Sequence, residues 1–286
     1  MKFKNVRIDS FAYELPSEFL TSEQIEKELG PVYSRLKLPE GRLELQTGIK
    51  SRGFWPVGTR PSQIATAAAK KLLEKSCIKK EKIEKLIFAS VCRDFLEPAS
   101  ASVVHANLGL AKTCQNFDLS NACLGVLSAM ELSAALIESG QIKNALIVSG
   151  ENGGPLLLET IKFLNTDESL TRKGIKKYIA NLTIGSAAVA ILLTHKDETN
   201  STHELLASQS LADTSANILC QGNGNTNTLM METQSEEMLQ AGVNLAQENW
   251  KRLSRELDWS SASINKVITH QVGVAHRKIK LKKLYL

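Results

Sequence analysis

The feature that most constrains the fold is a long helical segment with almost no charge, followed by an apolar strand. Residues 124–139 (LGVLSAMELSAALIES) are rich in Ala and Leu and contain no Pro, and Gly140 follows as a helix-ending residue. Residues 144–150 (NALIVSG) and 187–194 (AAVAILLT) are apolar runs of the kind found in sheets covered on both faces. We therefore predict an α/β fold with mixed or parallel sheets covered by helices. The helix over 124–139 is predicted to be buried nearly all round.

A cysteine stands directly before this helix, in the run DLSNACLG, and is residue Cys123. The positive end of a helix dipole favours the thiolate, and the thiolate is the nucleophilic form. A buried structural cysteine is the commoner role of a thiol outside a disulfide, so position alone leaves both interpretations open. If the helix is buried, a substrate must reach Cys123 through a tunnel or cleft. None of the other four cysteines opens a buried helix.

Composition is that of a cytoplasmic globular enzyme. The chain has 286 residues, of which 43% are hydrophobic, enough for a large core. Five cysteines without clustered spacing argue against a disulfide framework, and no spacing suggests a metal site. The N-terminus lacks a signal peptide's apolar region, and no run of 18 apolar residues predicts a membrane span. The last eleven residues, HRKIKLKKLYL, hold charge equal to the whole net charge of +5, so nucleic-acid binding is not expected.

Two parts of the chain share one order of elements. Residues 62–90 predict an Ala-rich helix, a short polar link and the strand EKLIFAS. Residues 235–271 predict a long helix, the polar link DWSSAS and the strand NKVITHQ. We therefore predict two related α/β halves, residues 1–195 and 203–286, with an irregular stretch over 221–227.

Three segments resemble motifs of one family. The run FDLSNACLGVLSAMELSAALIESGQIKNALIVSGE, from Phe117 to Glu151, is similar to the nucleophile segment of the thiolase superfamily. It is closest to β-ketoacyl-acyl-carrier-protein synthase III and its relatives. Residues 45–52 (LQTGIKSR) resemble that family's Thr-Gly-Ile…Arg signature, and residues 268–271 (ITHQ) resemble its His-Gln motif on a late strand. The resemblance extends from the first strand to about His276.

The resemblance implies the five-layered αβαβα thiolase fold. After His270 the pattern of the first half predicts another buried helix and two more strands, and the family places a Gly-rich segment with a catalytic Asn there. Sixteen residues follow, 271–286, and their end does not resemble the family's C-terminus. We therefore expect the second half to be truncated, with stability and activity reduced.

The resemblance also implies an acyltransferase of the 3-oxoacyl-acyl-carrier-protein synthase III type. Cys123 would attack an acyl thioester to form an acyl-enzyme, which then condenses with a carbanion from a second acyl donor in a Claisen reaction. His270 would stabilise the developing enolate, although a core histidine on a buried strand is the plain alternative. Arg52 and Gln271 are expected to bind substrate.

The implied partners are acyl-CoA and either acyl-carrier protein or a second acyl-CoA. These thioesters are substrates, so we expect no resident cofactor. A homodimer in fatty acid or lipid metabolism is the expected setting. A catalytically dead paralogue with a structural or binding role is the alternative from another class, supported by the short second half.

Glu97 is the residue that distinguishes between reaction types. It lies in RDFLEP, a turn-like segment after an apolar strand and ahead of a helix predicted over 99–108. One interpretation is a helix N-terminal carboxylate stabilised by the macrodipole. The other is a general base. The segment resembles that of the thiolase relatives that join two acyl-CoAs head to head, in which a glutamate enters the partner subunit's site and removes an α-proton.

Overall fold

The computed structural model describes residues 1–224, 229–270 and 273. They form two compact units that are interleaved along the chain. Unit 1 contains 1–18, 53–152 and 185–208, and unit 2 contains 19–52, 153–184 and the residues from 209 onward. This is a different division from the predicted halves 1–195 and 203–286, which stay a prediction.

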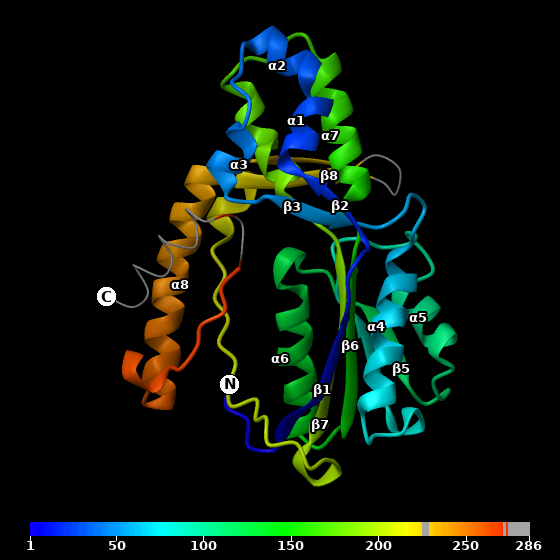
Figure 1. The fold of residues 1–286 in the computed structure, drawn as a ribbon. Coiled ribbons are helices and arrows are strands. Elements are labelled where there is room, and N and C mark those ends of the chain that lie inside the picture. The colour runs from blue at the N-terminus through cyan, green and yellow to red at the C-terminus, as the bar shows by residue number, and fades with distance from the viewer. Residues whose placement is uncertain (225–228, 271–272, 274–286) are drawn as a thin grey trace. The chain divides into compact units, whose positions relative to one another are not determined.

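A five-stranded mixed sheet organises unit 1 (Figure 1). Its order is β1-β7-β6-β4-β5, where β4 is parallel to β5 and β6, and β7 is antiparallel to its neighbours β1 and β6. The predicted mixed sheet is therefore confirmed. The strands are β1 (Val6–Glu14), β4 (Lys85–Phe88), β5 (Gln115–Asp118), β6 (Asn144–Glu151) and β7 (Ala187–His195).

Helices cover both faces of this sheet. Helices α4 (Pro61–Lys75) and α5 (Ser100–Leu108) lie on one face and α6 (Gly125–Glu138) lies on the other (Figure 1). Two apolar clusters follow from this layering, one between the sheet and α4 with α5, the other between the sheet and α6. Strand β6 is buried over its first seven residues, because it lies inside the sheet and between both layers.

One glycine allows the close approach of α4 to β6. A Cβ at Gly150 would collide with the carbonyl oxygen of Pro61, the first residue of α4. Pro61 suits that position because its missing N–H is one that the first helical turn leaves unpaired anyway. At the other end of the layer, Gly140 has φ of +73° and ends α6 as predicted.

The helix α6 is not buried all round, so that prediction is wrong. Its buried residues recur on one face and include Gly125, Ala129 and Ser133. Leu124 and Leu127, on the remaining surface, are 55% and 62% exposed. The small side chains on one face of α6 allow that face to pack closely against the sheet. The absence of charge from the sequence of the helix does not predict whether the other face is covered.

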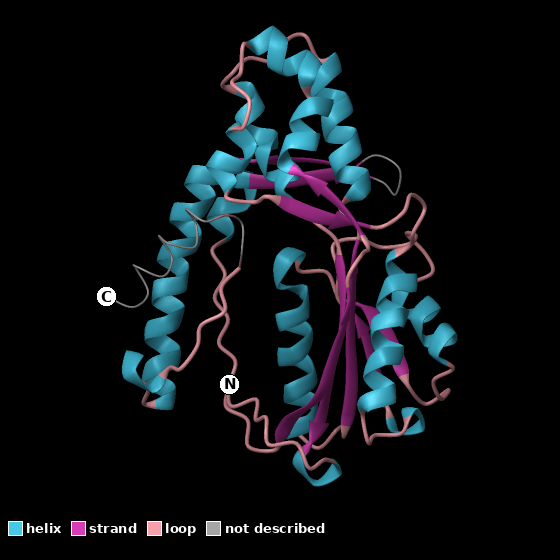
Figure 2. Cartoon of the chain, viewed as in Figure 1, coloured by secondary structure: helices cyan, strands magenta, loops and turns pink. Residues whose placement is uncertain are grey.

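Unit 2 is largely helical (Figure 2). Its helices are α1 (Ser22–Glu28), α2 (Gly30–Leu36), α3 (Arg42–Thr47), α7 (Gly154–Thr166), the 3-10 segment η3 (Gly174–Thr183) and α8 (Ser235–Leu257). Arg35 joins α2 to the end of α7 by donating to the carbonyls of Leu164, Asn165 and Asp167.

Short strands complete the described secondary structure. Strands β8 (Cys220–Gly224) and β9 (Leu229–Thr233) pair antiparallel. The predicted irregular stretch over 221–227 is thus wrong for its first part, because 221–224 lie in β8. Strands β2 (Glu18–Thr21) and β3 (Ser51–Phe54) form a separate two-stranded sheet.

The long helix of the second predicted repeat is confirmed as α8, but the strand predicted after it is not. Residues 264–270 contain no strand, and Ile268 is 85% exposed. A strand needs hydrogen-bonding partners, and none of the described strands pairs with this segment.

Candidate active site

The predicted nucleophile and the predicted base both lie on segments that follow the carboxyl ends of strands in the unit 1 sheet. Strands β4, β5 and β6 are parallel, so their carboxyl ends meet at one edge. The loop after β4 carries Glu97, the turn after β5 carries Cys123, and β6 ends with Glu151. Parallel pairing therefore places three chain segments with reactive groups at one end of the sheet.

Cys123 lies in a single 3-10 turn, Ala122–Leu124, that runs directly into α6. The N–H of Leu124 donates to the carbonyl of Asn121 at 2.9 Å and closes this turn. Ala122 has φ of +44°, a left-handed conformation that costs a non-glycine residue about 1–2 kcal/mol. Cys123 is exposed, and access of the substrate through a tunnel or cleft stays a prediction. The position before an α-helix N-terminus favours the thiolate.

The half-buried Cys92 and the buried Cys114 of unit 1 are poorer nucleophiles. Burial, followed by the nearby carboxylate of Glu151, raises the pKa of Cys92 to about 12. Burial raises the pKa of Cys114 to about 11. Both thiols stay protonated at neutral pH, and the thiol is the unreactive form.

Glu97 does not make the hydrogen bonds that cap the N-terminus of α5. That role belongs to Asp118, whose two oxygens accept from the N–H groups of Ser100 (2.9 Å) and Ala101 (2.7 Å). Glu97 is exposed, and within the described chain no hydrogen bond or ion pair engages its carboxylate. Both interpretations of Glu97, as a carboxylate stabilised by the helix dipole and as a general base, stay predictions.

Glu151 is a second acidic side chain at this edge, but it is already occupied. Its carboxylate accepts from the N–H groups of Val91 at 2.7 Å and Cys92 at 3.1 Å. Burial raises the pKa of Glu151 above its usual value, while these two N–H groups act in the opposite direction. By accepting these two hydrogen bonds, the Glu151 side chain holds the start of the loop that carries Glu97.

The other predicted site residues belong to unit 2. Arg52 is buried, and its Nη2 donates to Ser22 Oγ at 3.1 Å, while Nε and Nη1 have no partner among the described residues. Burial lowers the pKa of Arg52. His270 is exposed and stands outside any described strand, which contradicts the core-histidine alternative. Gln271 lies outside the described residues. The predicted roles of these three residues stay predictions.

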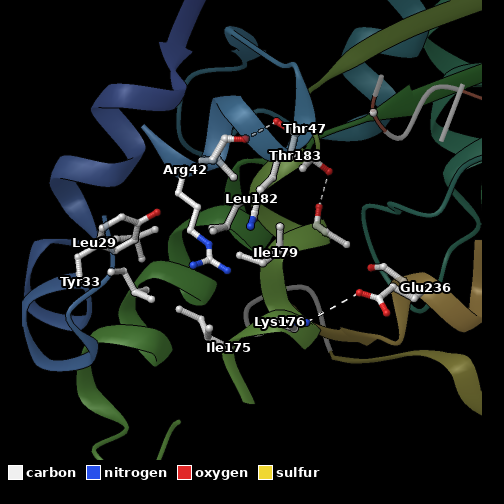
Figure 3. A pocket seen from close by; sticks show the side chains of 16 residues that line it. Leu29, Tyr33, Arg42, Thr47, Ile175, Lys176, Ile179, Leu182, Thr183 and Glu236 are labelled. Carbon is white, nitrogen blue, oxygen red and sulfur yellow. Dashed lines mark hydrogen bonds and ion pairs between the residues drawn. The ribbon is translucent and has the colours of Figure 1, made fainter. Parts of the chain in front are cut away.

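Unit 2 also contains a pocket of about 300 Å³ between α2, α3 and η3 (Figure 3). Arg42 comes from α3, and its guanidinium points toward Ile175 and Ile179 of η3. Lys176 lies at one end of the pocket, 3.8 Å from the carboxylate of Glu236. The pocket thus combines an apolar lining with the cation of Arg42 and the Lys176–Glu236 ion pair, which suits a ligand that has apolar and anionic parts.

Sequence reasoning missed this pocket because its walls come from segments more than a hundred residues apart. The described residues contain no group of His, Cys, Asp or Glu placed to hold a metal ion. None of the helices in the described part of the chain has the length and apolarity needed to span a membrane.

Comparison with known proteins assigns the family. Residues 117–157 match the family model of 3-oxoacyl-[acyl-carrier-protein (ACP)] synthase III. The acyl-CoA:acyl-CoA alkyltransferase of Shewanella oneidensis is 36% identical over 97% of this chain and 81% of the relative. The Xanthomonas campestris protein of the same name is 33% identical over 96% and 80%. The chain belongs to the thiolase-like synthase III family.

Solved structures agree with this assignment. OleA of Xanthomonas campestris, altered at one glutamate, superposes with a TM-score of 0.93 at 32% identity, over 99% of this chain and 82% of that one. A Cys-to-Ser variant of OleA with bound lauric acid and lauroyl-CoA gives a TM-score of 0.91. The predicted thiolase-like fold is therefore confirmed. The chain is an acyltransferase that forms an acyl-cysteine intermediate and performs a Claisen condensation of acyl thioesters.

Proposed function

We propose that the chain condenses two acyl-CoA molecules head to head without decarboxylation, with Cys123 as nucleophile and Glu97 as base. The Cys123 thiolate attacks the carbonyl carbon of one acyl-CoA, the new C–S bond forms, and the CoA thiolate leaves. The Glu97 carboxylate then takes an α-proton from a second acyl-CoA. The resulting enolate attacks the acyl-Cys123 carbonyl, a C–C bond forms, and the Cys123 thiolate leaves. The product is a 2-alkyl-3-ketoacyl-CoA.

The carboxylate of Glu97 carries this proposal. It is exposed, it has no partner among the described residues, and the helix it precedes already has Asp118 at its N-terminus. A decarboxylating enzyme needs no base here, because loss of carbon dioxide produces the carbanion.

The relatives support the same pairing of residues. Variants of Xanthomonas campestris OleA are altered at a glutamate and at a cysteine that lie 26 positions apart in that protein. Glu97 and Cys123 have the same separation here. OleA has also been altered at a histidine that lies 142 positions after that cysteine. In this chain His270 lies 147 positions after Cys123.

The unit 2 pocket is the part of the molecule that we propose holds acyl-CoA. Arg42 offers positive charge to phosphate groups, and the apolar lining offers contacts to the rest of the thioester. OleA binds lauroyl-CoA, a molecule of this composition.

A homodimer is also proposed, with Glu97 acting in the partner's site. Strand β5 pairs only with β4 among the described strands and is an edge of the unit 1 sheet. An edge strand is a ready template for pairing with another chain. The Glu97 loop is joined to the end of this strand through Asp118. A second copy across β5 would therefore lie next to the strand whose end holds the segment after Glu97.

The reaction type is tested with Glu97→Gln, which keeps size but removes the base. Condensation of two acyl-CoA molecules should fall about 10²-fold or more, while acylation of Cys123 persists. Acylation is measured by intact-protein mass spectrometry and product by chromatography. Unchanged condensation in Glu97→Gln, together with a strict need for a malonyl thioester, would assign the decarboxylating reaction instead.

The exchange of Glu97 between subunits is tested by mixing Cys123→Ala with Glu97→Gln. Each variant alone should be inactive in condensation. If Glu97 acts across the dimer, half of the randomly mixed dimers have one intact site, so about a quarter of wild-type activity should return. No recovery after verified subunit exchange would place Glu97 in the site of its own chain.

A further inference from the structure

The loop that carries Glu97 is closed at its base by one hydrogen bond. The N–H of Asp94 donates to the Oγ of Ser100 at 3.0 Å, so five residues, 95–99, protrude between them. Both closing residues are buried, with exposed fractions of 7% for Asp94 and 0% for Ser100. Leu96, beside Glu97 at the tip, is 80% exposed. A fixed base therefore supports an exposed tip.

The closed base is fastened to two different elements of unit 1. The Asp94 carboxylate accepts from the N–H of Ser62 at 2.9 Å and from its Oγ at 2.5 Å, which ties the loop to the first turn of α4. The N–H of Ser100 donates to Asp118 at 2.9 Å, which ties the other end to β5. Asp118 precedes Cys123 by five residues on the same segment. One end of the loop is thus tied to α4, and the other is tied to the segment that carries the nucleophile.

We infer that Asp94 and Ser100 are positioning residues for Glu97, which they hold at the height and angle needed for proton abstraction. The inference rests on the proposed role of Glu97. Neither residue is exposed to substrate, so each acts through the loop. A base must lie within hydrogen-bonding distance of the proton that it removes, and a misplacement of about 1 Å can cost about 10²-fold in rate.

Ser100→Ala tests the loop closure most directly. It removes the acceptor of the Asp94 N–H and leaves the Ser100 N–H on Asp118. Condensation should fall about tenfold or more, while acylation of Cys123 and the KM of the first acyl-CoA stay within about twofold. Ser133→Ala is the matched control, because Ser133 is an equally buried serine whose hydroxyl has no partner among the described residues. It should change neither step.

Asp94→Asn provides a second variant if Ser100→Ala folds poorly. The carboxamide keeps one acceptor for Ser62 and loses the other, so the loop keeps its N–H donor and becomes less firmly held. It should again lower condensation more than acylation. An equal loss in both steps, or a loss in neither, would overturn the inference.

A double-mutant cycle separates this inference from the proposed function. In a Glu97→Gln background, Ser100→Ala should cause no further loss of condensation, since no base remains to be positioned. The same fold-loss in both backgrounds would show that Ser100 acts independently of Glu97 and would overturn the inference. An unchanged rate in Glu97→Gln itself would refute the proposed function and the positioning role with it. A large loss in Glu97→Gln with none in Ser100→Ala would refute the positioning role alone.

Discussion

Replacing Glu26 should destabilise unit 2 and disturb one wall of its pocket. Glu26 lies in α1 and is 7% exposed. Its carboxylate accepts from the hydroxyl of Tyr33 at 2.9 Å and from the N–H groups of Gly41 at 2.7 Å and Leu43 at 2.6 Å. Tyr33 and Leu43 line the pocket, and Gly41 directly precedes Arg42. One buried carboxylate therefore organises the α2–α3 wall.

The size of the destabilisation follows from the three hydrogen-bond donors that would lose their acceptor in Glu26→Ala. The N–H of Leu43 is buried and loses its acceptor, which costs about 1–3 kcal/mol. Gly41 is exposed and Tyr33 is half-buried, so both can reach water, at about 0.5–1.5 kcal/mol each. The sum is about 4 kcal/mol, or a fall in Tm of about 8 °C at about 2 °C per kcal/mol for a protein of this size. Tyr33→Phe removes one of the three bonds and should cost about 1 kcal/mol.

Thermal unfolding and urea denaturation of wild type, Glu26→Ala, Glu26→Gln and Tyr33→Phe measure these differences. Glu26→Gln should fall between the other two variants, because a carboxamide keeps one acceptor oxygen and points its NH₂ at an N–H donor. The KM for acyl-CoA should rise in the same order if the pocket binds that substrate. The reasoning is refuted if Glu26→Ala is no less stable than Tyr33→Phe.

Two further predictions concern unit 1. Cys123→Ala should abolish acyl-enzyme formation and change the free energy of unfolding by less than about 0.5 kcal/mol, because the side chain is exposed; an acyl group found by mass spectrometry on another residue of this variant would contradict it. Burial raises the pKa of Glu151 above 4.5, so the native state keeps this proton to higher pH than the unfolded state. The wild type's free energy of unfolding should therefore contain a component that falls as pH rises from 4.5 through the raised pKa, and Glu151→Gln should lack it. If urea denaturation gives wild type and Glu151→Gln the same dependence of stability on pH between pH 4.5 and 7, this component is absent and the prediction fails.

Local patterns predicted the elements of unit 1 well. The apolar runs became β6 and β7, and the Ala-rich segment ended at Gly140 as its left-handed conformation requires. The prediction failed where pairing is non-local. Residues 265–270 have an apolar strand pattern, yet a strand forms only when another strand supplies its hydrogen bonds, and a single sequence does not specify that partner.

The site residues also differ in whether a local pattern of the sequence could identify them. Cys123 could be found because its signal, a cysteine directly before a helix, is contained in a few residues. The pocket and the support of the Glu97 loop could not, because Arg42 and Lys176 come from distant segments and Asp94 reaches Ser62 across 32 positions. Side chains that act through hydrogen bonds to distant backbone groups leave no periodic pattern in the sequence.

The acidic residues at the carboxyl end of the unit 1 sheet's parallel strands fall into two groups, those that hold loops and helix ends in place and one that has no such hydrogen bonds. Asp94, Asp118 and Glu151 each accept at least two hydrogen bonds, including backbone N–H groups, so their charge is used to hold loops and helix ends. Glu97 has the same functional group, no partner among the described residues, and an exposed position at the tip of a loop that the other three hold. A carboxylate whose oxygens already accept hydrogen bonds from its own chain is not positioned to reach a substrate proton, whereas a carboxylate without such donors can take a proton from a substrate carbon. The three occupied carboxylates thus leave Glu97 as the one at this end of the sheet with the capacity to act as a base.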